Sequence, residues 1–520
     1  MRRYLYVAAF LGGSLSNAGE FGEETLTWAS IGHRANNSVA CVLSYGAVFS
    51  WMQPYKAPQT FSCSGTGFFI DGKTLFDEEK HRYLLTNYHV IADAKRVYIT
   101  LSLFGKKRFE VSVEGVCPEW DLALLRLSEE SREWIEALTG PIQPLELGDS
   151  DNLYSTQSVL AVGYPLGFGI KTTSGAIAGR DFWKQPFLHV TTPINPGNSG
   201  GPLFTKDGKV VGINTASFRN AQNYNYVIPS KDILTVLPEL HSTKMVRRKS
   251  MGMIMNRTTD AHALLVGNPL PAGAYISYVF PDSAEYQAGL LQGDMLYEVI
   301  INECSFVVNE DGEVSVPWRK KEKISLAELL ARCRTTDSFS LVVYRNGEKL
   351  LLSSSFVLPS LYPIRRMYPD YEQEEIDFEI VGGLVCMQLR SNHLEWLFST
   401  YSQDRLLACL RGYVSERERN KQVLVVTQVF PGSQADFSQC FFEGSLLDKV
   451  NGDRVSTLQE LRESLTKSRD SQVITISTKD ELMSVFDLKK IIQDEYCLSY
   501  QFKYTITPGM EKLIGPSKEC

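Results

Sequence analysis

The sequence contains no long apolar run, no surplus of basic residues and no cysteine or histidine cluster at metal-ligand spacing. No segment approaches the roughly 18 uninterrupted apolar residues of a membrane-spanning helix, so we expect no stable membrane span. A formal net charge of −7 provides no broad basic face for a phosphate backbone, which argues against nucleic acid as a partner. The 10 cysteines include no CxxC pair, so we expect no metal, no other cofactor and no dense disulfide framework. Most cysteines are predicted to be buried as small apolar side chains.

The chain is long enough for several domains and begins with the features of an export signal. Its 520 residues exceed one hydrophobic core, and domains of roughly 100 to 200 residues predict two to four of them. Residues 2–3 are basic, residues 4–15 are largely apolar, and residues 16–18 are small. This order predicts a signal peptide over residues 1–18, cleaved after Ala18. The mature chain is therefore expected in the periplasm or another extracytoplasmic compartment.

Residues 39–229 consist of short apolar or alternating runs separated by turn residues, with little helical periodicity. This pattern predicts an all-β domain, and so many short strands favour a sandwich or a pair of barrels over a parallel βαβ sheet. A closing helix is expected to begin at Ser230, as its cap, and to end before Pro238. The expected strands are 66–70, closed by a turn at Asp71 and Gly72, then 83–86, 97–101, 122–127, 159–162, 187–191, 210–214 and 226–228.

The second half of the chain repeats a phrase, which predicts a duplicated module of mixed strands and helices. The sequence VFPDSA at residues 279–284 returns as VFPGSQA at residues 429–435. In the second copy an insertion spans residues 390–421. The matching elements expected are a helix at 325–333 and a strand at 338–344 with a hairpin turn at 346–347 in the first copy, and a helix at 458–465 and a strand at 473–478 in the second.

Two segments are interpreted as linkers. The polar residues 240–249 precede the first copy, and their basic run of Arg247, Arg248 and Lys249 is interpreted as solvated. Residues 359–377, rich in Pro, Tyr and Glu, are interpreted as a connector between the two copies.

Three residues in distant parts of the β-rich region have the chemistry of nucleophilic catalysis. Ser199 lies in the sequence NPGNSGGP at residues 195–202, where glycines allow a tight turn. His89 follows one predicted strand, and Asp121 precedes another. A serine that attacks a peptide carbonyl needs a base to take its proton and a carboxylate to orient that base. We therefore predict Ser199 as the nucleophile, His89 as the general base and then acid, and Asp121 as the orienting group.

The glycine-rich turn also predicts an oxyanion hole. The amides of Gly197 and Ser199, with Asn198 between them, are expected to point to one spot and to donate to the developing negative oxygen. Taken singly, a histidine, a strand-start aspartate or a serine in a turn is structural more often than catalytic. All three roles in the order His, Asp, Ser on a β-rich scaffold favour catalysis.

The string GxSxG at residues 197–201 also fits the nucleophile elbow of α/β-hydrolases. That interpretation needs a helix after the serine and partners in the order Ser, Asp, His. The residues after Ser199 instead lead through Pro202 into an apolar run and a turn at Asp207 and Gly208, so the context rejects it.

These motifs resemble the Deg/HtrA family of serine proteases. The resemblance is carried by TNYHVI at 86–91, DLALL at 121–125 and NPGNSGGPL at 195–203, with further matches at 65–68, 163–165 and 212–215, and it covers residues 39–237 almost continuously. It implies a chymotrypsin-like double β-barrel with the site between the barrels. It also implies ATP-independent cleavage of unfolded or damaged proteins and a homo-oligomer assembled from trimers.

The same resemblance suggests a specificity pocket and shows two departures from the family pattern. Ile194, Asn214 and Thr215 are expected at the pocket, which implies small aliphatic side chains before the cleaved bond. Thr192 and Pro193 replace the usual acidic-alanine pair, and residues 71–81 form a lengthened hairpin. These departures concern loop geometry and activation.

The duplicated modules resemble PDZ domains. A PDZ domain adds a peptide as a strand to its sheet edge and holds a C-terminal carboxylate in a nest of backbone amides. Met251, Gly252, Met253 and Ile254 fit that loop in the first copy, so peptide C-termini are expected there, with a purely architectural role as the alternative. In the second copy residues 382–384 fit the loop less well. This copy resembles the atypical second PDZ of plant-type Deg proteases, which suggests assembly.

We therefore expect a mainly β fold with α+β modules: a chymotrypsin-like double β-barrel followed by two PDZ-like domains. The expected function is that of a serine endopeptidase acting on unfolded or damaged proteins and regulated by peptide binding. The alternative is a peptide-binding chaperone or scaffold with an idle protease domain. The expected boundaries are 1–18 for the signal peptide, 19–239 for the protease domain, 249–358 and 378–505 for the PDZ domains, and 506–520 for a tail.

Overall fold

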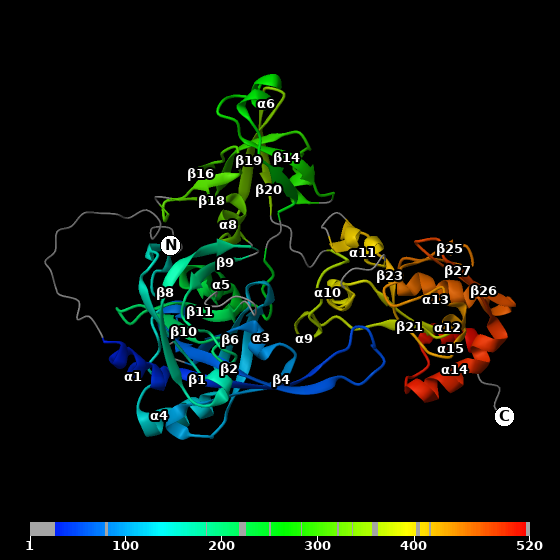
Figure 1. Ribbon diagram of the computed structural model, residues 1–520, viewed down its shortest axis with the longest axis horizontal. Coiled ribbons are helices and arrows are strands. Elements are labelled where there is room, and N and C mark those ends of the chain that lie inside the picture. The colour runs from blue at the N-terminus through cyan, green and yellow to red at the C-terminus, as the bar shows by residue number, and fades with distance from the viewer. Residues whose placement is uncertain are drawn as a thin grey trace.

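The computed structural model describes residues 27–515 except 78–81, 184, 218–224, 249–250, 282, 320–321, 335, 356–361, 402–405 and 415–417. The predicted signal peptide lies outside the described residues. Two closed barrels are followed by two mixed modules, here called the first and second module (Figure 1). None of the helices in the described ranges is long and apolar enough to cross a membrane.

Each barrel is closed by six antiparallel strands. The first has the order β1-β2-β3-β6-β5-β4 and the second the order β10-β11-β12-β9-β8-β7. The expected mainly β double barrel is therefore confirmed, and the predicted strands match within a few residues except that β2 and β11 are longer. The strands are β1 (Val39–Val48), β2 (Gln59–Ile70), β3 (Tyr83–Thr86), β4 (Ala94–Thr100), β5 (Phe109–Cys117), β6 (Leu122–Leu127), β7 (Ser158–Gly163), β8 (Lys171–Phe182), β9 (Pro186–Val190), β10 (Pro202–Phe204), β11 (Val210–Ser217) and β12 (Asn225–Pro229).

The barrels have separate cores and share a third. Neighbouring residues of a strand point to opposite faces, so Phe69 fills the first barrel while Phe68 lies in the cluster between the barrels. Trp120 from the first barrel and Phe204 from the second lie in that same cluster, and all of these side chains are fully buried. The two barrels are therefore joined by a continuous apolar core.

Short helices close the barrels. Helix α5 packs against strands of both barrels and continues through Pro238, so the predicted end before this proline is wrong. Its cap is Pro229, whereas Ser230 is its first residue and donates to the Gly148 carbonyl. The turn predicted at Asp71 is the start of a short helix, which Asp71 caps. The helices are α1 (Trp28–Ser38), α2 (Gly72–Phe76), α3 (Tyr88–Ile91), α4 (Glu129–Thr139) and α5 (Ser230–Ser242).

The first module is a sheet of order β13-β14-β15-β19-β20, with β16 paired to β15 and a separate ribbon of β17 and β18. Strand β13 is one edge of this sheet among the described residues, and β20 is the other. Asn346 and Gly347 form the predicted hairpin turn, with φ of 50° and 84°. The elements are β13 (Met253–Asn256), α6 (Asp260–Leu265), β14 (Ala274–Val279), α7 (Ala284–Gln287), β15 (Met295–Ile301), β16 (Cys304–Val307), β17 (Glu313–Ser315), β18 (Lys323–Ser325), α8 (Leu326–Ala331), β19 (Phe339–Arg345) and β20 (Glu348–Ser354).

The second module splits into sheets of order β21-β22-β23 and β25-β24-β26-β27. The 390–421 insertion contributes α10 and α11. Residues 508–514, predicted to belong to a tail, form α15 against β21 and α13. The elements are β21 (Phe378–Val381), β22 (Leu384–Gln388), α10 (Ser391–Thr400), α11 (Leu406–Val414), β23 (Leu424–Val429), α12 (Gln434–Ser438), β24 (Leu447–Val450), β25 (Asp453–Arg454), α13 (Leu458–Lys467), β26 (Val473–Thr478), β27 (Met483–Asp487), α14 (Leu488–Phe502) and α15 (Pro508–Ile514).

The duplication predicted from the repeated phrase has a structural counterpart. The amide of Phe280 donates to the Gly252 carbonyl, and the amide of Phe430 donates to the Gly383 carbonyl, both at 2.8 Å. Gly252 lies directly before β13, and Gly383 lies directly before β22, so these strands correspond. The two modules differ on the outer side of these strands, because β22 has the neighbour β21, which is joined to it by a two-residue turn. The strand edge that has no neighbour among the described residues of the first module is covered by β21 in the second.

Both linkers are packed rather than solvated. Arg247 and Arg248 are 7% and 8% exposed, so their interpretation as a solvated run is wrong, and Lys249 lies outside the described residues. The connector is buried at Ile364, Met367 and Tyr368 and contains helix α9 (Pro369–Glu372). The expectation that most cysteines are buried is not met either, since four of the nine described are buried, and all nine are free thiols.

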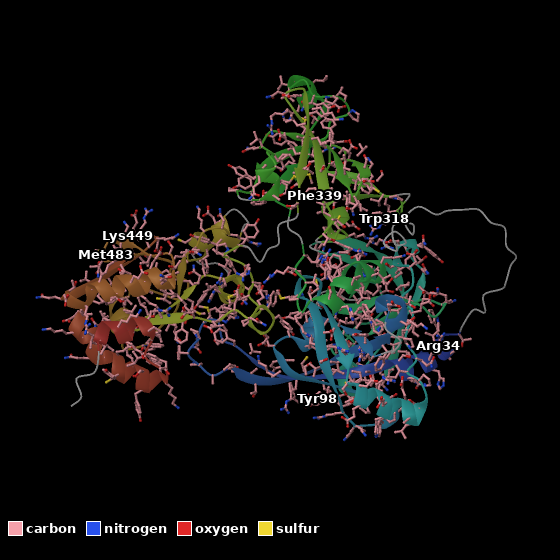
Figure 2. All side chains as sticks on the ribbon, turned by 180° about the vertical axis from the view of Figure 1, so that it is seen from behind. Arg34, Tyr98, Trp318, Phe339, Lys449 and Met483 are labelled. Carbon is pink, nitrogen blue, oxygen red and sulfur yellow. The ribbon has the colours of Figure 1, made fainter. Side chains whose placement is uncertain are left out.

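The first module rests on the double barrel through an ion-pair cluster. Arg332, at the C-terminal end of α8, pairs with Asp151 at 2.7 Å and with the fully buried Asp232 at 2.8 Å. The guanidinium also lies over the ring of Trp318. Figure 2 shows Trp318 and Phe339 at the end of this module that faces the barrels.

A hairpin of the first barrel reaches the second module. The segment between β1 and β2 carries Met52, which is 4% exposed and belongs to a cluster with Met387 and Leu394 of the second module. Nearby, the Tyr55 hydroxyl donates to Gln428 at 2.6 Å, and its ring packs edge-on against Phe430. The hairpin tip is therefore part of the core of the second module.

We predict that Met52→Ala releases this tip. Truncating a buried methionine typically costs about 2 to 5 kcal/mol, so the undocked fraction should rise at least about tenfold. The measurement is the rate of tryptic cleavage after the exposed Lys56 at the tip. The matched control is Met483→Ala, because Met483 is 60% exposed on the far face of the same module (Figure 2). Equal cleavage rates in the two variants would show that the tip is not held by its apolar contact.

Candidate active site

Three short turns position the predicted catalytic residues. His89 lies on α3, immediately after β3, rather than at the strand end itself. Asp121 follows a single 3-10 turn, residues 118–120, and adopts a left-handed conformation with φ of 54°. Ser199 lies in the loop between β9 and β10. Asp121 directly precedes β6, and His89 and Ser199 lie within a few residues of β3 and β10, so barrel strands anchor all three segments.

The structure brings His89 and Asp121 together. One carboxylate oxygen of Asp121 accepts from the backbone amide of His89 at 2.8 Å. The other accepts from the ring Nδ1 of His89 at 2.8 Å. With Nδ1 as the donor, Nε2 is left as the basic nitrogen. The pair has the arrangement that a general base requires.

Thr215 connects this pair to Ser199. Its hydroxyl donates to the Asp121 carboxylate at 2.5 Å, and its carbonyl accepts from the Ser199 hydroxyl at 3.0 Å. The serine hydroxyl thus points to a backbone carbonyl in this structure. A rotation about its χ1 angle separates this resting geometry from one in which it faces the imidazole.

The loop around Ser199 presents two unused amides. Gly197 has φ of 98°, a conformation that favours glycine. In the described part of the chain, neither the Gly197 amide nor the Ser199 amide has an acceptor. The amide of Asn198 between them donates to the Asn195 carbonyl at 2.9 Å, so it closes the turn. Gly197 and Ser199 remain the predicted donors of the oxyanion hole.

A threonine of the first barrel holds this loop in place. The Thr66 amide donates to the Ser199 carbonyl at 2.8 Å, and its hydroxyl donates to the Gly197 carbonyl at 2.6 Å. The sequence places Thr66 in a short matching string and predicts Thr215 at the specificity pocket, and it predicts neither of these contacts. Both threonines act across the gap between the barrels, which no local pattern encodes.

The residues predicted for the specificity pocket are buried. Ile194 is 7% exposed and belongs to the core cluster of the second barrel. Asn214 is fully buried, accepts from the Gly200 amide and donates to the Gly201 carbonyl. Thr215 contacts the histidine–aspartate pair, as described above. Asn214 and Thr215 therefore support the serine loop, and a specificity role stays a prediction.

The residues predicted for peptide capture surround the start of β13. Met253 is buried and Ile254 is 38% exposed on the open strand. A Cβ atom on Gly252 would collide with Ser283 and with the buried carboxyl of Glu285. Only glycine therefore fits at position 252. The corresponding glycines of the second module, Gly382 and Gly383, form the turn between β21 and β22.

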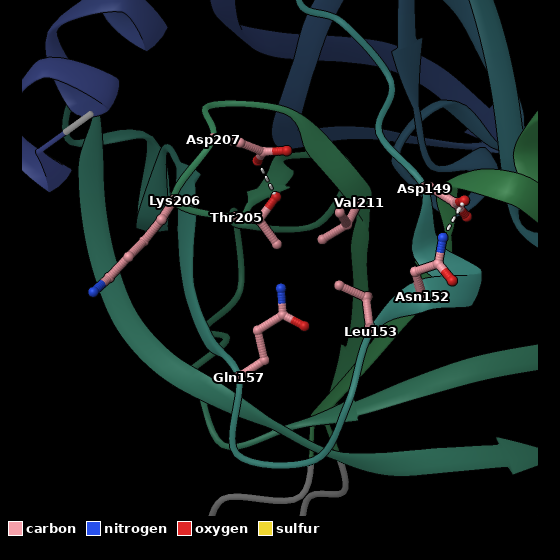
Figure 3. A pocket seen from close by; sticks show the side chains of 8 residues that line it. All are labelled: Asp149, Asn152, Leu153, Gln157, Thr205, Lys206, Asp207 and Val211. Carbon is pink, nitrogen blue, oxygen red and sulfur yellow. Dashed lines mark hydrogen bonds between the residues drawn. The ribbon is translucent and has the colours of Figure 1, made fainter. Parts of the chain in front are cut away.

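A separate hollow lies at the side of the second barrel, lined among others by Asp149, Asn152, Gln157 and Asp207 (Figure 3). Its carboxylates are used for local structure. Asp149 accepts from the Asp151 amide and the Asn152 side chain, and Asp207 accepts from Thr205. None of the predicted catalytic residues lines this hollow.

Asp121 changes the pKa of His89. Partial burial lowers the pKa of His89, but the hydrogen bond that its ring donates to Asp121 and the negative charge of Asp121 outweigh burial, so the pKa is raised above 6.5. The ring therefore holds its proton to a higher pH than a free histidine. Above this pKa the ring is neutral, and it is then a stronger base than the ring of a free histidine.

The fold and the site define a class of protein. A family model for the trypsin-like peptidase domain matches residues 65–213, and a model for the PDZ domain matches residues 369–505. The chain thus combines a trypsin-like peptidase domain with a PDZ domain.

Within this class, the chain is similar to proteins named as DegP-like and HtrA-type proteases. A probable periplasmic serine endoprotease, DegP-like, of Marinomonas sp. is 37% identical over 247 residues, which is 46% of this chain and 48% of the relative. A protein of the same name from Hahella chejuensis is 30% identical over 307 residues, 57% and 58% of the two chains. The chain spans about half the length of the curated relatives that it matches. Among solved structures, the HtrA-type protease AlgW with tripeptide has a TM-score of 0.49 and 27% identity, covering 66% of this chain and 99% of that one.

We predict that Asp121→Asn lowers the pKa of His89. Removing the negative charge leaves burial as the main effect on the ring, and burial favours the neutral form. The pKa should therefore fall from above 6.5 to below it. The measurement is an NMR titration of the His89 ring proton, with His262, remote from Asp121, as the internal control. An unchanged or raised value would mean that Asp121 does not set the charge of this ring.

Proposed function

We propose that this chain is a serine endopeptidase with Ser199 as nucleophile, His89 as general base and acid, and Asp121 as orienting group. The observation that carries the proposal is the bridge through Thr215, which contacts both Asp121 and Ser199. Because Thr215 contacts both residues, it supports the proposal that Ser199 and the His89–Asp121 pair act together in one site.

The reaction begins when the Ser199 hydroxyl turns from the Thr215 carbonyl to Nε2 of His89. The ring takes the proton as Oγ bonds to the peptide carbonyl carbon, and Asp121 stabilises the resulting imidazolium. The negative oxygen accepts from the amides of Gly197 and Ser199. His89 then donates its proton to the leaving amine, and a water molecule, activated by His89, hydrolyses the acyl-enzyme.

The proposed substrates are unfolded or damaged proteins, cleaved without ATP. An extended chain can reach a site between two barrels, whereas a folded protein presents few such segments. The curated relatives are named as periplasmic enzymes. We accordingly propose an extracytoplasmic location for this chain and a trimer-based homo-oligomer.

Ser199→Ala should abolish cleavage. Loss of a triad serine lowers turnover by about a millionfold, so casein, an unfolded protein, should stay intact. Labelling of the resting wild type by a fluorophosphonate should also disappear. The control is Ser174→Ala, an exposed serine on β8. The same measurements decide against an idle protease domain, because a chaperone or scaffold would show equal, negligible cleavage in all three proteins.

The open edge of β13 supports peptide binding at the first module. A peptide added as a strand beside β13 would pair with backbone groups that have no strand neighbour among the described residues, and its C-terminus would approach Met251 and Gly252. In the second module β21 occupies the corresponding edge of β22. This difference supports ligand capture by the first module and assembly by the second. A bound peptide is proposed to raise the cleavage rate by biasing loop conformations.

Ile254→Asp should weaken peptide binding at least about tenfold, because it places a charge beside the added strand and removes an apolar contact. The measurement is fluorescence anisotropy with a labelled peptide that ends in an apolar residue. Val307→Asp serves as the control, since Val307 is 73% exposed on β16 of the same module. Equal weakening by both changes would place the peptide elsewhere.

A further inference from the structure

Two consecutive arginines, Arg247 and Arg248, lie buried where the barrels, the first module and the connector meet. We call them the arginine pair. Burying a guanidinium is unfavourable unless charged or polar partners replace its water. The contacts of the arginine pair therefore identify which elements must be in place together.

Arg247 joins the connector to the first barrel. Its guanidinium donates to the Glu372 carboxylate at 2.5 and 3.0 Å and to the Arg366 carbonyl at 2.7 Å. The same group pairs with Glu119 at 3.3 Å. It also lies over the ring of Tyr368, with the charge 5.1 Å from the ring centre. The fork of the guanidinium reaches both sides at once, which a lysine cannot do.

The first-barrel contacts of this group adjoin the proposed catalytic pair. Glu119 belongs to the 3-10 turn that aims Asp121. Tyr368, beneath the guanidinium, packs edge-on against Tyr88, the residue before His89, at 5.8 Å between ring centres. The Tyr88 amide in turn donates to the Asp121 carbonyl at 3.1 Å. The connector thus supports, from behind, the two turns that carry His89 and Asp121.

Arg248 extends this support to the first module. Its guanidinium stacks over Trp120, the residue before Asp121, 4.2 Å from the ring centre. It donates to the carbonyls of Ala331 and Cys333 at the end of α8. Helix α8 is the element that docks on the barrels through Arg332. The connector and the first module therefore both reach the Asp121 turn through adjacent residues of one linker.

We propose that Arg247, with its connector partner Glu372, is a positioning residue for the His89–Asp121 pair. It holds the Asp121 turn and the His89 helix in register although it lies outside the barrels and touches no reacting atom. The catalytic centre is then completed by chain segments that follow the protease domain. This inference rests on the proposed function for its kinetic consequences and on the structure alone for its effect on the His89 ring.

The test compares Arg247→Lys and Glu372→Gln with wild type in the full-length protein. Each change breaks the bridge at one end, so Asp121 should shift from the imidazole, and kcat for casein cleavage should fall about tenfold with KM little changed. Because Asp121 raises the pKa of His89, the acid limb of the kcat/KM profile should move to lower pH. The control is Glu146→Gln, since Glu146 forms an exposed pair with Lys209.

The NMR titration of His89 separates positioning from mere stability. A stabilising role alone would lower the melting temperature and leave the His89 pKa and the acid limb of the folded protein unchanged, which would overturn the proposal. A lower pKa in both variants, with the control unchanged, supports it. If the wild type neither cleaves casein nor reacts with a fluorophosphonate, the proposed function fails, while the titration still tests the arginine pair.

Discussion

The carboxylate of Asp121 is the point on which the geometry of the site depends. It accepts hydrogen bonds from the amide and ring of His89 and from the Thr215 hydroxyl, so donors from both barrels converge on one group. The first two donors fix the imidazole, and the third fixes the strand that faces Ser199. Alignment therefore persists while the barrels keep their relative position, which the apolar core shared by Phe68 and Phe204 maintains.

The parts of this arrangement that are local in sequence could be predicted. The strands follow from two-residue alternation, and the loop around Ser199 follows from glycines that permit φ values such as the 98° of Gly197. The role of Thr215 could not be predicted, because its partner Asp121 is 94 residues away and meets it across two barrels. The three residues proposed as a catalytic triad nevertheless have enough local sequence context to be predicted.

The linkers show why charge patterning misleads at domain junctions. A basic run is solvated in most proteins because isolated charges lose their hydration on burial. Arg247 is buried because Glu119 and Glu372, 128 and 125 residues away, replace that hydration. The hairpin tip is the apolar counterpart: Met52 belongs to a loop of the first barrel, and its core neighbours belong to another module. In both cases the partner decides burial, and the sequence separates the partners widely.

The two duplicated modules attach to the double barrel by different kinds of contact. They share the glycine turn and its contact with the following phenylalanine, yet the second module covers its strand edge with β21 and receives the hairpin tip. The first module keeps its edge open and attaches through ionic groups, Arg332 and Arg248. Apolar contacts favour permanent docking, whereas buried ion pairs add little net stability and demand exact partners. The second module is thus held by an apolar contact, whereas the first is held by buried charges whose partners must all be in place.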